Sequence, residues 1–226
     1  MVRSIKFCKT QGVLQKAEVL GSEILNPYNE VLNHYNSLNA KQTLRRFQII
    51  DNEIAGLNPF ICVNLQKVLP KNKRFATRED LEAGICFSEL FLEDCIDFGI
   101  ALETAWDSNY KQNDFIARNL AEQLKDRGIK LDRGKLILFS LFEDTPESEN
   151  SSYGLVFKLA DLSSREIKEK VMDLDRINWI YRRKRGISCA YFGWNSVWCC
   201  SDGNLGLFYP DTRAIVISAE GALTAD

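Results

Sequence analysis

The stretch from Glu79 to Asp107 holds the residues of this chain that are best suited to electrostatic recognition. It contains nine carboxylate side chains and no lysine or arginine. The 78 residues before it carry twelve basic and five acidic residues, so a chain of overall net charge −2 has strongly segregated charges. Segregated charge attracts and orients partners of opposite charge. We therefore expect the acidic stretch to meet a cationic surface.

A helical projection gives this stretch a predicted geometry. From Phe87 to Trp106 the apolar residues recur at helical spacing, which predicts an amphipathic helix. With Phe87 at 0° and about 100° per residue, the apolar stripe spans about 0–100°, and an acidic face lies opposite at about 160–280°. Two isoleucines fall in the middle of that face. The residues predicted to bind a partner are Glu89, Glu93, Ile96, Asp97, Ile100, Glu103 and Asp107.

An apolar centre inside a charged rim is typical of a protein-binding patch. Like charges at i, i+4 also destabilise a helix, so an all-acidic face needs an explanation. Three interpretations stay open: a solvated surface, a patch for a basic protein partner, or a surface covered by the basic N-terminal region of the same chain. The favoured function is a non-enzymatic protein-binding protein, for example an inhibitor or immunity protein that blocks the cationic cleft of a nuclease.

A second candidate site is the strongest basic cluster of the chain. Phosphate contacts from arginine and lysine, with bases stacking on aromatic rings, are typical of nucleic-acid binding. The alternatives are a charged strand edge that discourages aggregation, or a docking face for the acidic stretch. The residues of this cluster are Tyr181, Arg182, Arg183, Lys184 and Arg185.

Motifs for enzyme chemistry are weak. His34 is the single histidine, and no serine or cysteine near it lies in a nucleophile turn. The segment from Gly128 to Lys135 resembles a phosphate loop, but it has five residues between its glycines, is followed by Leu136 instead of Ser or Thr, and precedes a strand. An enzyme whose site is assembled from dispersed carboxylates or thiols remains the alternative function.

The sequence also predicts no metal and no cofactor. Glu89, Glu93 and Asp97 share i, i+4 spacing, but the Glu-x-x-His pattern of di-metal bundles is missing, as is any C-x-x-C pair. No G-x-G-x-x-G fingerprint indicates a dinucleotide. The seven cysteines lack the spacing of a disulfide framework. Without a signal peptide or a membrane-length apolar run, we expect a cytoplasmic protein with no membrane partner, while its oligomeric state stays open.

The elements that must position these residues indicate an α+β fold, in which central helices pack on a mainly antiparallel sheet with a C-terminal β-meander. We expect one domain over residues 1–226, with a weak candidate boundary in the polar segment 143–152. Predicted helices begin at Asn26, Phe87, Asn113 and Ser163, the third ending at Gly128 and the last opening with a capping box. Predicted strands are Phe60–Leu65, Lys135–Phe142, Tyr153–Leu159, Ile187–Phe192, Ser196–Cys200, Leu205–Tyr209 and Ala214–Ser218.

Overall fold

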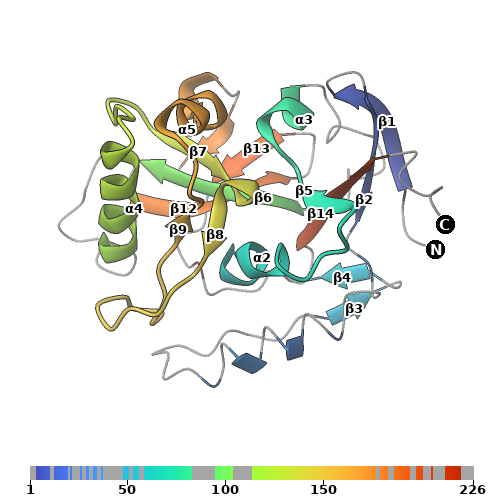
Figure 1. The fold of residues 1–226 in the computed structure, drawn as a ribbon, viewed down its shortest axis with the longest axis horizontal. Helices are drawn as coiled ribbons and strands as arrows, with labels where there is room; N and C mark the ends of the chain where they lie inside the picture. The colour runs from blue at the N-terminus through green and yellow to red at the C-terminus, as the bar shows by residue number, and fades with distance from the viewer. Residues whose placement is uncertain are drawn as a thin grey trace.

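The computed structural model of the chain has an α+β fold, in which helices pack against a mainly antiparallel sheet (Figure 1). This confirms the fold class predicted from the sequence. The structure describes residues 4–10, 13–19, 21, 26, 29–30, 33–34, 37, 48–50, 53–55, 59–82, 95–103, 114–176, 179–182, 186–193, 197–200, 205 and 212–219.

The described helices are short, and most of the regular structure is strand. The helices are α2 Pro59–Leu65, α3 Arg78–Glu82, α4 Asp114–Asp126 and α5 Ser164–Lys170, with 3₁₀ turns η3 Phe139–Leu141 and η4 Leu174–Arg176. The strands are β1 Ser4–Thr10, β2 Val13–Val19, β3 Gln48–Ile50, β4 Glu53–Ala55, β5 Lys73–Phe75, β6 Cys95–Glu103, β7 Lys135–Leu138, β8 Phe142–Asp144, β9 Lys158–Leu159, β10 Met172–Asp173, β11 Trp179–Arg182, β12 Gly186–Gly193, β13 Val197–Cys200 and β14 Thr212–Ala219.

Ten of the described strands form one sheet, whose main path is β1-β2-β14-β6-β12-β13-β11. Off this path, β5 pairs with β14, and β7 pairs with both β6 and β10. In the view of Figure 1, α3 and α5 lie above the sheet, α2 lies below it and α4 stands at one end of its strands. The pairs β3–β4 and β8–β9 form two small separate hairpins.

Strand β6 joins the two halves of this sheet. One of its edges pairs with β12 along nearly its whole length. Its other edge pairs in parallel with β14 over residues 95–97, and then antiparallel with β7 over residues 99–102. The register with β12 shifts so that Phe98 is an extra residue between two paired positions, which is a β-bulge. The bulge therefore lies where β6 changes its partner from β14 to β7.

The predicted helix from Phe87 to Trp106 is wrong over the whole of β6. Every residue from Phe98 to Glu103 is buried. A strand covered on both faces reads as a nearly continuous apolar run, without the alternation that identifies a half-buried strand. Such a run also contains apolar residues at helical spacing by chance. This coincidence produced the predicted helix from Phe87 to Trp106.

The opposite error occurs at Phe60–Leu65, which was predicted as a strand and is helix α2. The helix begins at Pro59, a residue suited to the first helical position, and all seven of its residues are buried. A helix that is apolar all round has no amphipathic pattern. Its one polar interior residue is satisfied, because the side-chain amide of Asn64 donates to Thr145 Oγ1 at 2.6 Å and to the carbonyl oxygen of Phe60 at 2.9 Å.

The predicted helices at Asn113 and Ser163 are confirmed as α4 and α5. Gly128 follows α4 with φ 71°, the left-handed conformation that a helix C-terminus favours in glycine. The Ser163–Glu166 capping box of α5 is complete, since each side chain bonds the backbone amide of the other residue. Both boundaries depend on local chemistry, which explains why the sequence located them.

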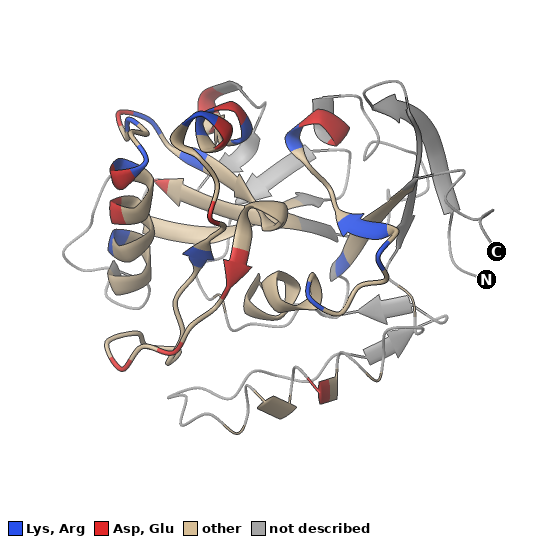
Figure 2. Ribbon diagram, viewed as in Figure 1, with Lys and Arg blue, Asp and Glu red and all other residues tan. Residues whose placement is uncertain are grey.

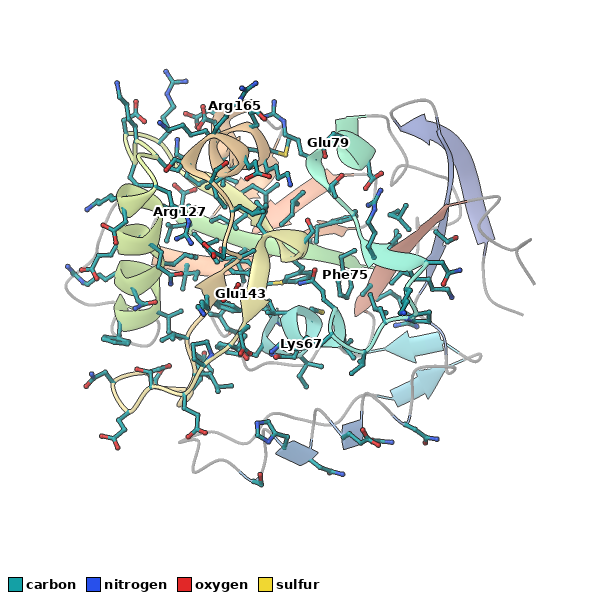
Figure 3. All side chains as sticks on the ribbon, viewed as in Figure 1. Lys67, Phe75, Glu79, Arg127, Glu143 and Arg165 are labelled. Atoms are coloured by element: carbon teal, nitrogen blue, oxygen red, sulfur yellow. The ribbon has the colours of Figure 1, made fainter. Side chains whose placement is uncertain are left out.

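The polar segment 143–152 begins inside β8 and continues into the connection to β9, so it is part of a long hairpin. The predicted strand Lys135–Phe142 divides into β7, η3 and β8, and the predicted strand Tyr153–Leu159 is regular only in β9. Two ion pairs hold the hairpin: Lys158 Nζ lies 2.5 Å from Glu143, and Lys67 Nζ lies 2.7 Å from Asp144 (Figure 3, which labels Lys67 and Glu143). The side chains of these pairs are 34% to 58% exposed, so each pair contributes little to stability.

The C-terminal strands are not all neighbours in the sheet, as the strands of a meander would be. Strands β12 and β13 are antiparallel neighbours, as predicted. Strand β14 lies elsewhere, between β2 and β5, with its first residues beside β6. The predicted strand Leu205–Tyr209 falls outside the described residues except for Leu205, which is a buried turn residue.

Candidate functional site

The acidic face predicted from the helical projection does not form in β6. Ile100 is fully buried and Glu103 is 4% exposed, so neither is open to a partner. Ile96 and Asp97 belong to the same strand, with Asp97 paired to both Tyr191 and Ala214. The remaining residues of the predicted face, Glu89, Glu93 and Asp107, lie outside the described residues.

One carboxylate of the acidic stretch is satisfied within the chain by the basic N-terminal region. Asp80 is fully buried and forms a two-point ion pair with Arg74, whose Nη2 lies 3.1 Å from Asp80 Oδ1. The same carboxylate accepts hydrogen bonds from the amide and hydroxyl of Thr77, at 2.8 and 3.0 Å. At this position, therefore, the segregated charges meet inside one molecule.

The ion pair between Asp80 and Arg74 makes the stability of the fold depend on pH. Burial by itself raises the pKa of Asp80, but the hydrogen bonds from Arg74 and Thr77 and the charge of Arg74 outweigh it, so the pKa lies below its ordinary value. The charged form stabilises the native state above the unfolded pKa, and that stabilisation is lost as the pH falls through the lowered folded pKa. We expect the free energy of unfolding to decrease below about pH 4, as measured by urea denaturation.

The matched variants for this prediction are Asp80→Asn and Glu79→Gln, each of which removes one carboxylate from α3. The stability difference between the native chain and Asp80→Asn should shrink between about pH 5 and about pH 3, whereas Glu79→Gln should retain the native acid dependence. An Asp80→Asn protein with an unchanged acid dependence would contradict a role for this ion pair.

The basic cluster predicted to bind nucleic acid begins in β11. Tyr181 and Arg182 pair in register with Cys199 and Cys200 of β13, and β11 ends the main path of the sheet. Residues 183–185 lie outside the described part of the chain. Nucleic-acid binding by this cluster therefore stays a prediction.

The structure reveals a different concave site, which we call the basic pocket. It has a volume of about 630 Å³ and lies where α3, α5, β10 and the segment between α4 and β7 meet. Figure 2 shows both charge signs concentrated on these elements. The charged residues that line the pocket are Arg78, Lys130, Asp132, Lys135, Lys168 and Asp173.

The interior charge of the basic pocket is Lys135, whose side chain is only 7% exposed. Its ammonium group lies 2.5 Å from Asp173 Oδ1 and 3.9 Å from Asp132 Oδ1. A buried lysine needs such a partner, because an unpaired charge is costly away from water. Lys135 and Asp173 thus largely neutralise each other.

The charges of the two lysines at the rim are less neutralised by carboxylates than the charge of Lys135. Lys130 and Lys168 are exposed, and neither forms a salt bridge or side-chain hydrogen bond with any residue that the structure describes. Arg78 donates from Nη1 to the backbone carbonyl of Glu169 at 2.8 Å, which links α3 to α5. With four basic and two acidic lining residues, the basic pocket carries a net charge of about +2 at neutral pH.

The absence of a side chain at Gly128 leaves space for one of the cations of the basic pocket. A β-carbon at this position would lie 3.1 Å from Lys168 Nζ, and the positive φ already disfavours any other residue. The glycine that ends α4 therefore also makes room for a lysine from α5.

Sequence reasoning missed the basic pocket, although it considered part of it. The segment from Gly128 to Lys135 was rejected as a phosphate loop, and it is not one, because it connects a helix to a strand. Its glycine and lysines nevertheless line the pocket. The other cations come from α3 and α5, and no local motif connects them.

Other classes of site find no support in the described residues. No cluster of three or more His, Cys, Asp or Glu side chains there is arranged to hold a metal ion. None of the helices in this part of the chain combines the length and apolar character needed to span a bilayer. Comparisons with protein-family models, curated proteins and solved structures gave no match.

Proposed function

We propose that this protein is a binding protein that accepts an anionic group, such as a phosphate, in the basic pocket. The observation that carries this proposal is the pair of rim lysines, Lys130 and Lys168, which lie at the mouth of a concave site without a partner among the described residues. Cationic side chains that converge on a concavity raise the local concentration of anions.

The size and composition of the basic pocket support a small ligand. Its volume of about 630 Å³ falls within the roughly 300–1,000 Å³ typical of small-molecule sites. The two rim lysines act as point charges for an oxyanion, and Arg78 adds a third cation to the lining. This combination suits a phosphate better than an isolated carboxylate, because a phosphate offers more acceptor oxygens and charge.

A binding protein is also what the sequence predicts, but the proposed ligand is an anion and not a basic protein. A basic protein partner for the acidic stretch stays a prediction that depends on Glu89, Glu93 and Asp107. The alternative of an enzyme whose site is assembled from dispersed carboxylates or thiols also stays a prediction.

The test is calorimetric titration with inorganic pyrophosphate. We expect the Lys130→Gln/Lys168→Gln variant to bind it at least about tenfold more weakly, because each lost charge contributes of order 1 kcal/mol at a partly solvated site. Raising the salt concentration should weaken binding by the native chain as well, since these rim charges are screened.

The matched control is Lys71→Gln/Lys125→Gln, which removes the same net charge from exposed positions that do not line the basic pocket. Its affinity for pyrophosphate should stay within about twofold of the native value. Equal losses in the two double variants would show a general charge effect, and no binding by the native chain would overturn the proposed function.

A further inference from the structure

We infer that the anionic ligand of the basic pocket is a nucleotide, with its phosphate on the cations and its base on an apolar strip beside them. This inference builds on the proposed anion-binding function and specifies the class of ligand. It depends on the lining residues that carry no charge, and on the exposed carboxylate of Asp132 at the rim.

Three apolar side chains line the pocket next to its cations: Ile129, Val171 and Met172. Ile129 directly precedes Lys130 in the loop after α4, and Val171, the residue that follows α5, stands three residues after Lys168. A ligand that bound here would therefore touch apolar and cationic surface at the same time.

The amount of exposed apolar surface limits the size of the apolar group that a ligand can place in the basic pocket. Ile129 and Val171 are each 8% exposed, and Met172 is more exposed than either. Ile129 and Val171 also belong to the hydrophobic core, so this small apolar area can contact one face of a ring, whereas a fatty acyl chain would need a long apolar channel. Methionine also suits a flat ring, because its flexible thioether makes favourable contacts with aromatic groups.

The exposed carboxylate of the pocket, Asp132, fits a base that carries amino groups. Asp132 has a side chain that is 67% exposed, at 3.9 Å from Lys135, so its oxygens remain open at the rim. A carboxylate in this place can accept hydrogen bonds from an exocyclic amine of a ligand. A ligand with a phosphate at one end and an amino-bearing ring at the other satisfies both kinds of side chain.

The experiment compares three probes by calorimetric titration: ADP, pyrophosphate and adenosine. We expect the native chain to bind ADP about tenfold or more tightly than pyrophosphate, and adenosine most weakly. Met172→Ala should weaken ADP binding about fivefold and leave pyrophosphate binding unchanged within about twofold, whereas Met172→Leu should restore most of the ADP affinity. Retained pyrophosphate binding shows that the variant is folded.

The outcomes separate the two proposals. Pyrophosphate that binds as tightly as ADP overturns the nucleotide inference and leaves anion binding in place, and a chain that binds neither probe overturns both. A short oligoadenylate without a terminal phosphate distinguishes a free nucleotide from a nucleic-acid strand. Competition by this strand equal to that of ADP would assign the site to nucleic acid and overturn the inference.

Discussion

Gly99→Ala is expected to lower the free energy of unfolding by about 3 kcal/mol or more, the upper end for overpacking. A β-carbon at position 99 would press on the carbonyl oxygen of Ile137 and lie 2.8 Å from the Cα atom of Leu138. Both atoms are backbone atoms of β7, so relief requires β6 and β7 to separate. Because this contact follows directly after the Phe98 bulge, separation would disturb the point where β6 changes partner.

Urea denaturation measures this effect, and Gly134→Ala is the control. A β-carbon at Gly134 would also meet close atoms, at 2.7 Å, but these are the carboxylate oxygen of Glu103 and a terminal methyl group of Leu174. Side-chain ends can move, so we expect a smaller loss, about 1 kcal/mol. If Gly99→Ala were tolerated as well as Gly134→Ala, the close approach of β6 to β7 would be incorrect.

Phe60→Ala is expected to lower the free energy of unfolding by about 3–5 kcal/mol, the range for a large aromatic residue removed from a core. Phe60 is fully buried on α2. Its ring stacks on Phe157 with centroids 4.7 Å apart and lies 5.4 Å from the ring of Tyr153. The substitution removes these contacts and leaves a cavity between α2 and the residues that precede β9.

The control for this substitution is Phe115→Ala. Phe115 lies near the start of α4 and is 36% exposed, so its loss should cost about 1 kcal/mol or less. Chemical denaturation of both variants gives the comparison, and an unchanged m-value shows that a shifted midpoint reflects changed stability. Similar losses in the two proteins would contradict the central position of α2.

The two wrong element predictions have one physical cause. Elements buried on every side, such as β6 and α2, lose the pattern by which polarity reveals secondary structure. Residues 98–102 are apolar or glycine on both faces of a strand, and Phe60 to Val63 are apolar all round a helix. A helix and a strand would bury the same apolar side chains of such a segment. Its conformation is therefore decided by the elements that pack around it.

The elements that were predicted correctly depend on groups that act locally. The Ser163–Glu166 capping box satisfies backbone amides within one turn, and Gly128 adopts a positive φ at the end of α4. The exposed positions of the predicted N-terminal helix, Asn26 and His34 among them, are helical as expected. Each of these signals lies within a few residues of the structure that it specifies.

The candidate site was only partly predictable for the same reason. The segment from Gly128 to Lys135 is visible in the sequence through its glycines and lysines. Arg78, however, lies 50 residues before Gly128, and Lys168 lies 33 residues after Lys135. The charge count predicted a strong electrostatic feature and placed it on the acidic stretch. In the structure, two of those acids, Asp80 and Glu103, are buried.

By itself, the sequence determined the α+β class, the local ends of helices α4 and α5, and the segregation of charge along the chain. These follow from composition and from contacts within a single turn. The tertiary structure alone decided that β6 is a strand, that Asp80 meets Arg74, and that four distant cations surround one pocket. Those outcomes depend on which buried surfaces pack together, because burial sets both the conformation of an apolar segment and the partner that a charge requires.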